Sequence, residues 1–114
     1  MTNLVDKRIL AASPLTEASF YILVSLAQPL HGYGVMQMVA ELSEGRVHLA
    51  PGTLYGALAN LQSLGMIESV EESGGEERRK VYRLTALGHA LAEYEIRRLD
   101  EMSSNGKRLL GMGG

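Results

Sequence analysis

The sequence predicts a mainly helical α+β domain in which three short helices precede a β-hairpin and a longer helix follows it. Two patterns support this class. Apolar residues recur at helical spacing in three segments between residues 16 and 64. After residue 65 the period changes to short stretches rich in β-branched and aromatic residues, which favour strands. A chain of 114 residues has room for one hydrophobic core, so these elements should share it.

The first two helices have recognisable boundaries. The first, 16–28, begins at Thr16, a good N-cap, and ends before Pro29, which interrupts a helix. The second spans 32–43. The residues expected to face the core are Phe20, Ile22, Leu23, Leu26 and Ala27 in the first helix and Val35, Met38, Val39 and Leu42 in the second.

The third helix, 51–64, has Pro51 at its first position and Gly65 just after its end, as helices commonly do. Its expected core face consists of Leu54, Ala57, Leu58, Leu61 and Leu64. The stretches MIESVEE and KVYRLT then flank the turn sequence SGGEERR, which predicts a hairpin.

The last helix should begin after Thr85, its N-cap, and end near residue 103. We therefore divide the chain into a helix and hairpin unit, 1–84, a C-terminal helix, 85–103, and a glycine-rich tail, 104–114, which we expect to be flexible.

The composition narrows the classes of function. With 46% hydrophobic and 21% charged residues the chain is ordinary for a globular domain, and the absence of cysteine excludes disulfides and thiolate metal sites. The three histidines are scattered, so we expect no metal and no other cofactor. The sequence contains no recognisable nucleophile–base pair, phosphate loop or carboxylate pair, so we expect the chain not to be an enzyme. The N-terminus lacks the apolar stretch of a signal peptide, which predicts a cytoplasmic protein.

The outward face of the third helix is the first candidate for a binding surface. It consists of Thr53, Tyr55, Gly56, Ala59, Asn60, Gln62 and Ser63. Glycine and alanine let a backbone approach another surface closely, and the amide and phenol groups can hydrogen-bond to bases or phosphates. An ordinary solvated helix face has a similar composition, so both interpretations stay open at this point.

Three helices followed by a hairpin is the order of a winged helix-turn-helix domain, whose third helix enters the major groove of DNA. Tyr33 and Gln37 face away from the core of the second helix and are further candidates for DNA contact. The hairpin turn adds Arg78, Arg79 and Lys80, which can bind phosphates, although two glutamates precede them. The net charge of −2 weakens this case, so a winged-helix module that binds protein instead of DNA is the alternative.

Three stretches resemble the signature segments of the PadR family of transcriptional regulators: HGYGVMQMV, PGTLYGALANLQSLGMIES and KVYRLTALGHAL. The resemblance spans roughly residues 15–95. It implies a dimeric winged-helix regulator, usually a repressor, that binds a palindromic operator in double-stranded DNA. It also implies that Tyr55 belongs to the recognition helix, Tyr33 to the helix before it and the basic cluster 78–80 to the wing.

Two features depart from that family. Members commonly carry Lys or Arg in the recognition helix after the tyrosine, whereas GALANLQS contains no cation, so phosphate binding would rest on the wing and on Arg46. Short members that sense flat aromatic drugs have a tryptophan in the last helix, and this chain has none. The sequence therefore does not predict drug sensing of that kind.

The last helix predicts a homodimer, because its apolar sector is wider than the stripe of about 100° that one core contact needs. The expected interface consists of Leu87, Leu91, Tyr94, Arg98, Leu99 and Met102. A charge in this sector needs a partner. For Arg98 the options are Glu95, a residue of the second subunit, an acidic small-molecule effector bound at the dimer interface, or water reached by the long side chain.

Overall fold

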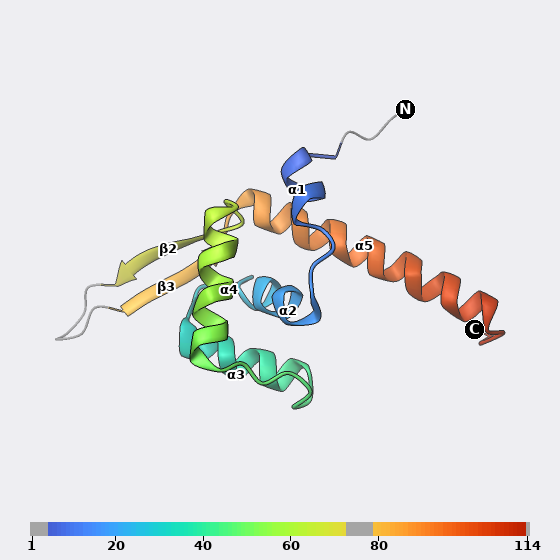
Figure 1. The fold of residues 1–114 in the computed structure, drawn as a ribbon, viewed down its shortest axis with the longest axis horizontal. Helices are drawn as coiled ribbons and strands as arrows, with labels where there is room; N and C mark the ends of the chain where they lie inside the picture. Colours follow the sequence, from blue (N-terminus) through green and yellow to red (C-terminus); the bar gives the residue numbers. More distant parts are fainter. Residues whose placement is uncertain (1–4, 73–78, 114) are drawn as a thin grey trace.

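The computed structural model describes residues 5–72 and 79–113, and at residues 72 and 79 only the backbone. This part of the chain forms helices and a small sheet (Figure 1). Their bounds are α1 (Lys7–Ala12), α2 (Glu17–Ser25), β1 (Leu30–His31), α3 (Gly32–Leu42), α4 (Pro51–Ser63), β2 (Ile67–Glu72), β3 (Arg79–Leu84) and α5 (Ala86–Leu109). The predicted α+β class is confirmed, and α1 and β1 are additions to it.

The core lies between α2, α3, α4 and the first half of α5. Its fully buried side chains include Ile22, Leu23, Leu26, Val35, Val39, Leu54, Leu58, Leu61, Met66, Ile67 and Leu91. These are the residues that the helical periodicity places on the inner faces, together with the two that begin the hairpin. Ala27, Leu42 and Leu64 were expected in the core and are exposed instead, because each lies at or beyond a helix end where no neighbouring element covers it.

The sheet is antiparallel with the order β1-β3-β2. The hairpin pairs Ile67 with Leu84 at its base, and the two-residue strand β1 pairs Leu30 with Tyr82 on the other side of β3. The backbone amide of Leu84 also donates to the carbonyl of Leu26 at 3.3 Å. These bonds attach the predicted wing to the helical core at its base, while the strands extend away from the body (Figure 1).

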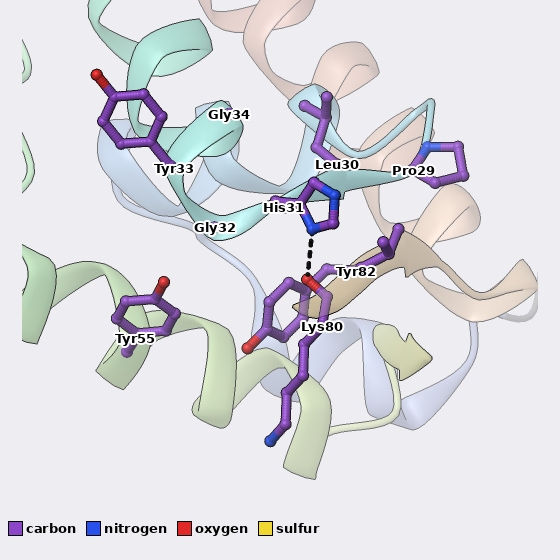
Figure 2. Close-up of a pocket in the computed structure, with 10 residues that line it drawn as sticks. Pro29, Leu30, His31, Gly32, Tyr33, Gly34, Tyr55, Lys80 and Tyr82 are labelled. Carbon is purple, nitrogen blue, oxygen red and sulfur yellow. Dashed lines mark hydrogen bonds between the residues drawn. The ribbon is translucent and has the colours of Figure 1, made fainter. Parts of the chain in front are cut away.

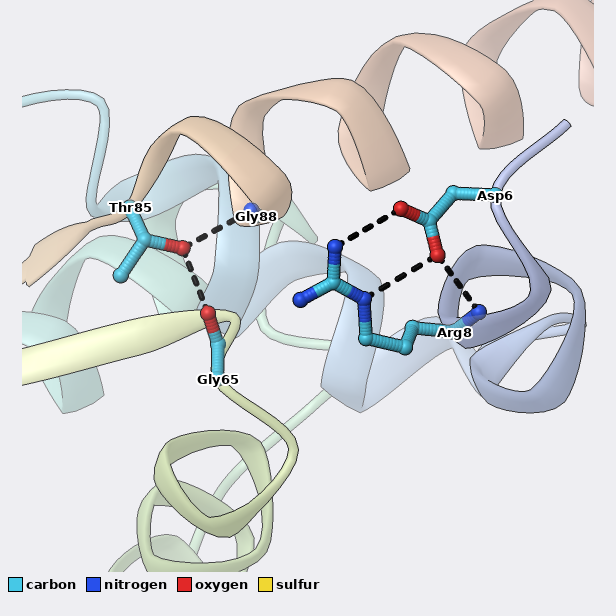
Figure 3. Close-up of polar contacts among 5 residues, drawn as sticks. All are labelled: Asp6, Arg8, Gly65, Thr85 and Gly88. Carbon is cyan, nitrogen blue, oxygen red and sulfur yellow. Dashed lines mark hydrogen bonds and ion pairs between the residues drawn. The ribbon is translucent and has the colours of Figure 1, made fainter.

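Helix α1 packs against α5, with Ile9 buried between them. It begins at Asp6, whose carboxylate accepts the backbone amide of Arg8 at 2.8 Å and pairs with the guanidinium of the same residue (Figure 3). The side-chain and backbone hydrogen bonds from Arg8 lower the pKa of Asp6 to about 2. A helix of six residues is too short to show a helical repeat of apolar residues, so the sequence did not indicate it.

Helix α5 continues to Leu109, so the expected end at residue 103 was wrong. Its stop is a Schellman motif: Gly111 takes a left-handed φ of +69°, and the amide of Met112 donates to the carbonyl of Lys107 at 2.8 Å. The last turn also carries Lys107 and Arg108, which suit the negative end of the helix dipole. Gly106 lies inside the helix. No described helix is long and apolar enough to cross a membrane.

Candidate nucleic-acid interface

The outward face of α4 is exposed as the sequence predicted. Thr53, Tyr55, Gly56, Asn60 and Ser63 all lie on the solvent side of the helix, opposite its buried leucines. A methyl group added at Gly56 would have no atom within 4 Å, so the surface there is open. Ser63 donates its hydroxyl to the carbonyl of Asn60 at 2.7 Å, whereas the amide of Asn60 is left toward solvent. The exposed face of α4 therefore consists of small and polar residues and contains no cation.

Tyr55 joins α4 to the start of α3. Its ring is 50% exposed and lies against the backbone of Gly32, where an added Cβ would stand 2.6 Å from the phenol oxygen and 2.9 Å from Cζ. A side chain at position 32 would displace this ring. The ring packs on α3 and keeps one side open to solvent, and its contact with DNA stays a prediction.

A groove of about 900 Å³ opens between the start of α3, the side of α4 and strand β3 (Figure 2). Tyr33, which is 67% exposed, Tyr55 and Lys80 line it from three different elements. His31 Nδ1 lies 3.2 Å from the backbone carbonyl oxygen of Lys80 and joins β1 to β3 at the base of the groove. Burial and the nearby Tyr55 raise the pKa of Tyr82, which forms the inner wall.

The expected basic residues of the hairpin are only partly described. Lys80 is exposed on β3. Arg78 lies outside the described residues, and of Arg79 only the backbone, in β3, is described. Arg83, three residues beyond Lys80, forms an ion pair with Glu68 of the neighbouring strand at 2.7 Å. Lys80 is therefore the described wing cation that lines the groove.

Gln37 is exposed one turn after Tyr33 on α3, as predicted. Arg46 has a partner within the chain. Its guanidinium binds the carboxylate of Glu17, with Nε 2.7 Å from Oε1, and this contact raises the pKa of Arg46. The pair borders a cavity next to α5 that shares no lining residue with the groove of Tyr33 and Tyr55. Arg46 thus attaches the segment before α4 to the start of α2, and its contact with phosphate stays a prediction.

The residues predicted to form a dimer interface divide into two groups. Leu91 is fully buried in the core of its own chain, so it has no surface to offer a second copy, and this part of the prediction was wrong. Leu87 and Tyr94 are half-buried beside it. Leu99 and Met102 are 40% and 57% exposed, and Ile96, at the edge of the same sector, is 45% exposed.

Arg98 takes the first of its four possible partners. Its Nε donates to Glu95 at 2.7 Å, and Glu95 is 1% exposed. The same carboxylate accepts the Ser13 hydroxyl at 2.8 Å and the Leu15 amide at 2.5 Å. Burial raises the pKa of Glu95, but these three hydrogen bonds outweigh it and hold the pKa below its usual value.

Glu95 is the buried functional group that sequence reasoning considered only as a partner of Arg98. Its position contains a signal, because it follows Leu91 by four residues and so falls on the same inner face of α5. The carboxylate attaches α5 to the segment between α1 and α2. Among the described residues no three His, Asp or Glu side chains come together as a metal site.

Residues 21–94 match the PadR-like family of transcriptional regulators. The chain belongs to this family. It is 34% identical over 74 residues to the transcriptional regulator Rv3488 of Mycobacterium tuberculosis, covering 65% of this chain and 66% of that protein. It is 36% identical over 88 residues, 76% of this chain, to an uncharacterized 37.1 kDa protein in transposon TN4556 of Streptomyces fradiae, and spans only 24% of that longer protein.

Solved structures of PadR-family regulators have the same fold. The regulator from Eggerthella lenta superposes with a TM-score of 0.70 at 21% identity, covering 94% of this chain and 88% of that one. The PadR protein of Bacillus subtilis, solved in complex with operator DNA, gives a TM-score of 0.58 at 24% identity over 67% of this chain and 45% of that chain. Membership in a family of transcriptional regulators agrees with the prediction that the chain is not an enzyme.

Proposed function

We propose that this PadR-family chain is a cytoplasmic repressor that binds a palindromic operator in double-stranded DNA as a homodimer. The observation that carries the proposal is the open face of α4 beside the groove of Tyr33, Tyr55 and Lys80. A helix of this kind fits the major groove when its exposed residues are small or polar. The operator complex of the Bacillus subtilis PadR protein supports the choice of DNA as partner.

Each part of the surface has a role in this proposal. Asn60 reads a base edge, and Gly56 allows the backbone of α4 to come close to the bases. Tyr33 and Lys80 contact phosphates on either side of the groove beside α4, because they border it from α3 and β3. The start of α3 presents backbone amides at the same groove, which favours a phosphate there. These contacts compensate for the lack of cations in α4.

The homodimer uses the second half of α5. Ile96, Leu99 and Met102 are exposed at helical spacing, and Leu109 and Leu110 near the end of the helix are each 77% exposed. In Figure 1 this half of α5 projects beyond the body of the protein. Exposed apolar side chains in a row are typical of an interaction surface. A second copy would cover them and supply the second α4 for a palindromic operator.

Release from DNA by a small-molecule effector stays a prediction. Arg98 motivated it, and in this chain Glu95 already balances the charge of Arg98. An acidic effector at the dimer interface would have to displace this buried carboxylate. If Arg98→Met changes neither dimer stability nor ligand-induced release from DNA, the effector pocket is not at this residue.

The decisive experiment compares two glycine substitutions in helices. A Cβ at Gly56 or at Gly106 meets no atom within 4 Å, so Ala at either position should stabilise the fold by up to about 1 kcal/mol. On α4 the same methyl would stand between the helix and DNA. We expect Gly56→Ala to weaken binding to a selected operator about tenfold or more, equivalent to about 1.4 kcal/mol. Gly106→Ala, on the half of α5 assigned to the dimer, should leave binding unchanged when both variants are assayed at a concentration where sedimentation shows only dimer.

Operators for this test come from selection on a random DNA pool, and affinity is measured by fluorescence anisotropy. A parallel Asn60→Ala variant should lose discrimination at one operator position rather than affinity for every sequence. If the selection yields no sequence, or Gly56→Ala binds as tightly as the parent, α4 does not read DNA. The alternative of a protein-binding winged helix then replaces the proposal.

The wing has its own test. Lys80→Ala should weaken binding to all sequences alike and reduce the slope of log affinity against log salt by about one, as expected for one lost phosphate contact. Lys107→Ala removes the same charge from the far end of α5 and serves as the control. Equal salt slopes for the two variants would exclude Lys80 from the DNA contact.

A further inference from the structure

The turn that follows α4 meets the first turn of α5 (Figure 3). The Thr85 hydroxyl donates to the carbonyl of Gly65, just after α4, at 2.6 Å, and its oxygen accepts the amide of Gly88 at 3.1 Å. The amide of Thr85 donates to the carbonyl of Met66 at 3.1 Å. One side chain thus caps α5 and at the same time binds the end of α4. We call these contacts among Gly65, Met66, Thr85 and Gly88 the α4–α5 joint.

Small residues make the joint tight. A Cβ at Gly88 would stand 2.8 Å from the carbonyl carbon of Met66 and closer still to its oxygen, so the first turn of α5 touches the backbone directly. Gly65, just after α4, has a φ of +78°, which other residues rarely adopt, and its carbonyl accepts the Thr85 hydroxyl. Neither contact can slide without a clash or a lost hydrogen bond. The joint therefore holds the two helices at one angle.

A comparison with Thr16, the N-cap of α2, shows which bond of Thr85 exceeds ordinary helix capping. Thr16 accepts the amide of Ser19 at 3.0 Å, much as Thr85 accepts that of Gly88. Within the described residues, Thr16 has no second bond to another helix, whereas Thr85 binds a carbonyl 20 residues earlier in the chain. Capping alone explains Thr16. It does not explain why the hydroxyl of Thr85 also binds Gly65.

We propose that Thr85 is a positioning residue that sets the angle between α4 and α5, and through it the spacing of operator half-sites that the dimer accepts. This inference rests on the proposed function, in which α4 reads DNA and the second half of α5 forms the dimer. The residues around Met102 lie about 26 Å along the helix from Thr85, at about 1.5 Å per residue. A change of about 10° at the joint moves that interface by about 4 Å, more than the rise of about 3.4 Å for one base pair.

The first experiment measures spacing preference. An operator selected by the unaltered protein is rebuilt with one base pair added or removed between its half-sites. We expect the unaltered protein, Thr16→Val and Thr85→Ser to prefer the original spacing at least tenfold. Thr85→Val keeps the shape of the side chain but loses both hydroxyl bonds, and it should reduce the preference to threefold or less.

Both valine variants lose an N-cap, so both thermal midpoints should fall, and that of Thr85→Val should fall further because it also loses the bond to Gly65. Only Thr85→Val should lose the spacing preference. The rescue by serine distinguishes the hydroxyl from the shape of the side chain. If Thr85→Val keeps the tenfold preference, or if Thr16→Val loses it as well, the positioning role is overturned.

A second measurement needs no DNA. The chain contains no cysteine, so spin labels can be attached at Ala59→Cys on α4 and Asp100→Cys on α5, both exposed, and diluted with unlabelled protein to isolate distances within one protomer. We expect one narrow distance when the label pair is placed in the otherwise unaltered protein or in Thr85→Ser, and a broad or displaced one in Thr85→Val. A narrow, unchanged distance in Thr85→Val would overturn the inference. Failure to select any operator would instead reject the proposed function, and this distance would still decide the joint.

Discussion

The two halves of α5 differ although they form one continuous helix. The first half, up to Glu95, is joined to α4 through Thr85, buried at Leu91 and bound to the α1–α2 segment through Glu95. The second half, from Ile96 onward, carries its apolar side chains in solvent. A broad apolar sector in a helix can therefore be the sum of two narrower ones. One belongs to the core of the chain, and the other is available to a partner.

The strongest way to break this comparison is to truncate one leucine in each half. Leu91→Ala leaves a cavity in the core and should lower the free energy of unfolding by about 2–5 kcal/mol at every protein concentration. Leu99→Ala, at a site 40% exposed, should have its larger effect where the dimer forms and a smaller one on dilution than Leu91→Ala. Denaturant melts over a hundredfold concentration range measure both. Equal, concentration-independent losses would show that the halves do not differ.

Charges placed on the second half should separate folding from assembly. We expect Leu99→Glu combined with Met102→Glu to raise the dissociation constant of the dimer at least a hundredfold, or about 2.7 kcal/mol, and to leave the circular dichroism of the helices unchanged. Sedimentation velocity reports the assembly state. A monomeric parent protein at micromolar concentration would refute the homodimer itself, whereas a double variant that stays dimeric would place the interface elsewhere.

Two glutamates on opposite sides of α5 sharpen the comparison further. Glu95→Ala leaves the Leu15 amide and Ser13 without their acceptor and Arg98 without its partner. It should destabilise the fold by about 2–3 kcal/mol, below the full cost of breaking a buried ion pair because Arg98 can turn to water. Glu93→Ala breaks only exposed pairs, which contribute at most about 0.5 kcal/mol. Chemical denaturation of both variants at pH 7 makes the measurement.

Acidification should also lower the stability of the fold through Glu95, by less than the substitution Glu95→Ala does. The pKa of Glu95 is lower in the folded chain than its ordinary value of 4.5, so its contribution to stability is complete above that value and is lost as the pH falls through the folded pKa. Asp6, with a pKa of about 2, contributes in the same direction. Thermal midpoints between pH 7 and pH 3 should fall less for Glu95→Gln than for the parent. Parallel curves would contradict the assignment.

Much of the fold and part of the candidate site follow from local patterns. Thr16 and Thr85 as caps, Pro51 at the start of α4 and the switch from helical to strand periodicity are all signals that act within a few residues, and each matches the structure. The outward face of α4 follows in the same way, because a helix that buries its leucines must expose the positions between them.

The tertiary structure alone decided which element covers which face. Periodicity shows that Leu91 and Leu99 are both apolar, but only the position of the other helices buries the first and leaves the second exposed. The pairing of Arg46 with Glu17 and the packing of Tyr55 on Gly32 join residues more than twenty positions apart, which no local pattern records. Sequence periodicity determines the direction of a side chain relative to its own helix, whereas burial, ion pairing and the angle between helices depend on which distant segments occupy the space around it.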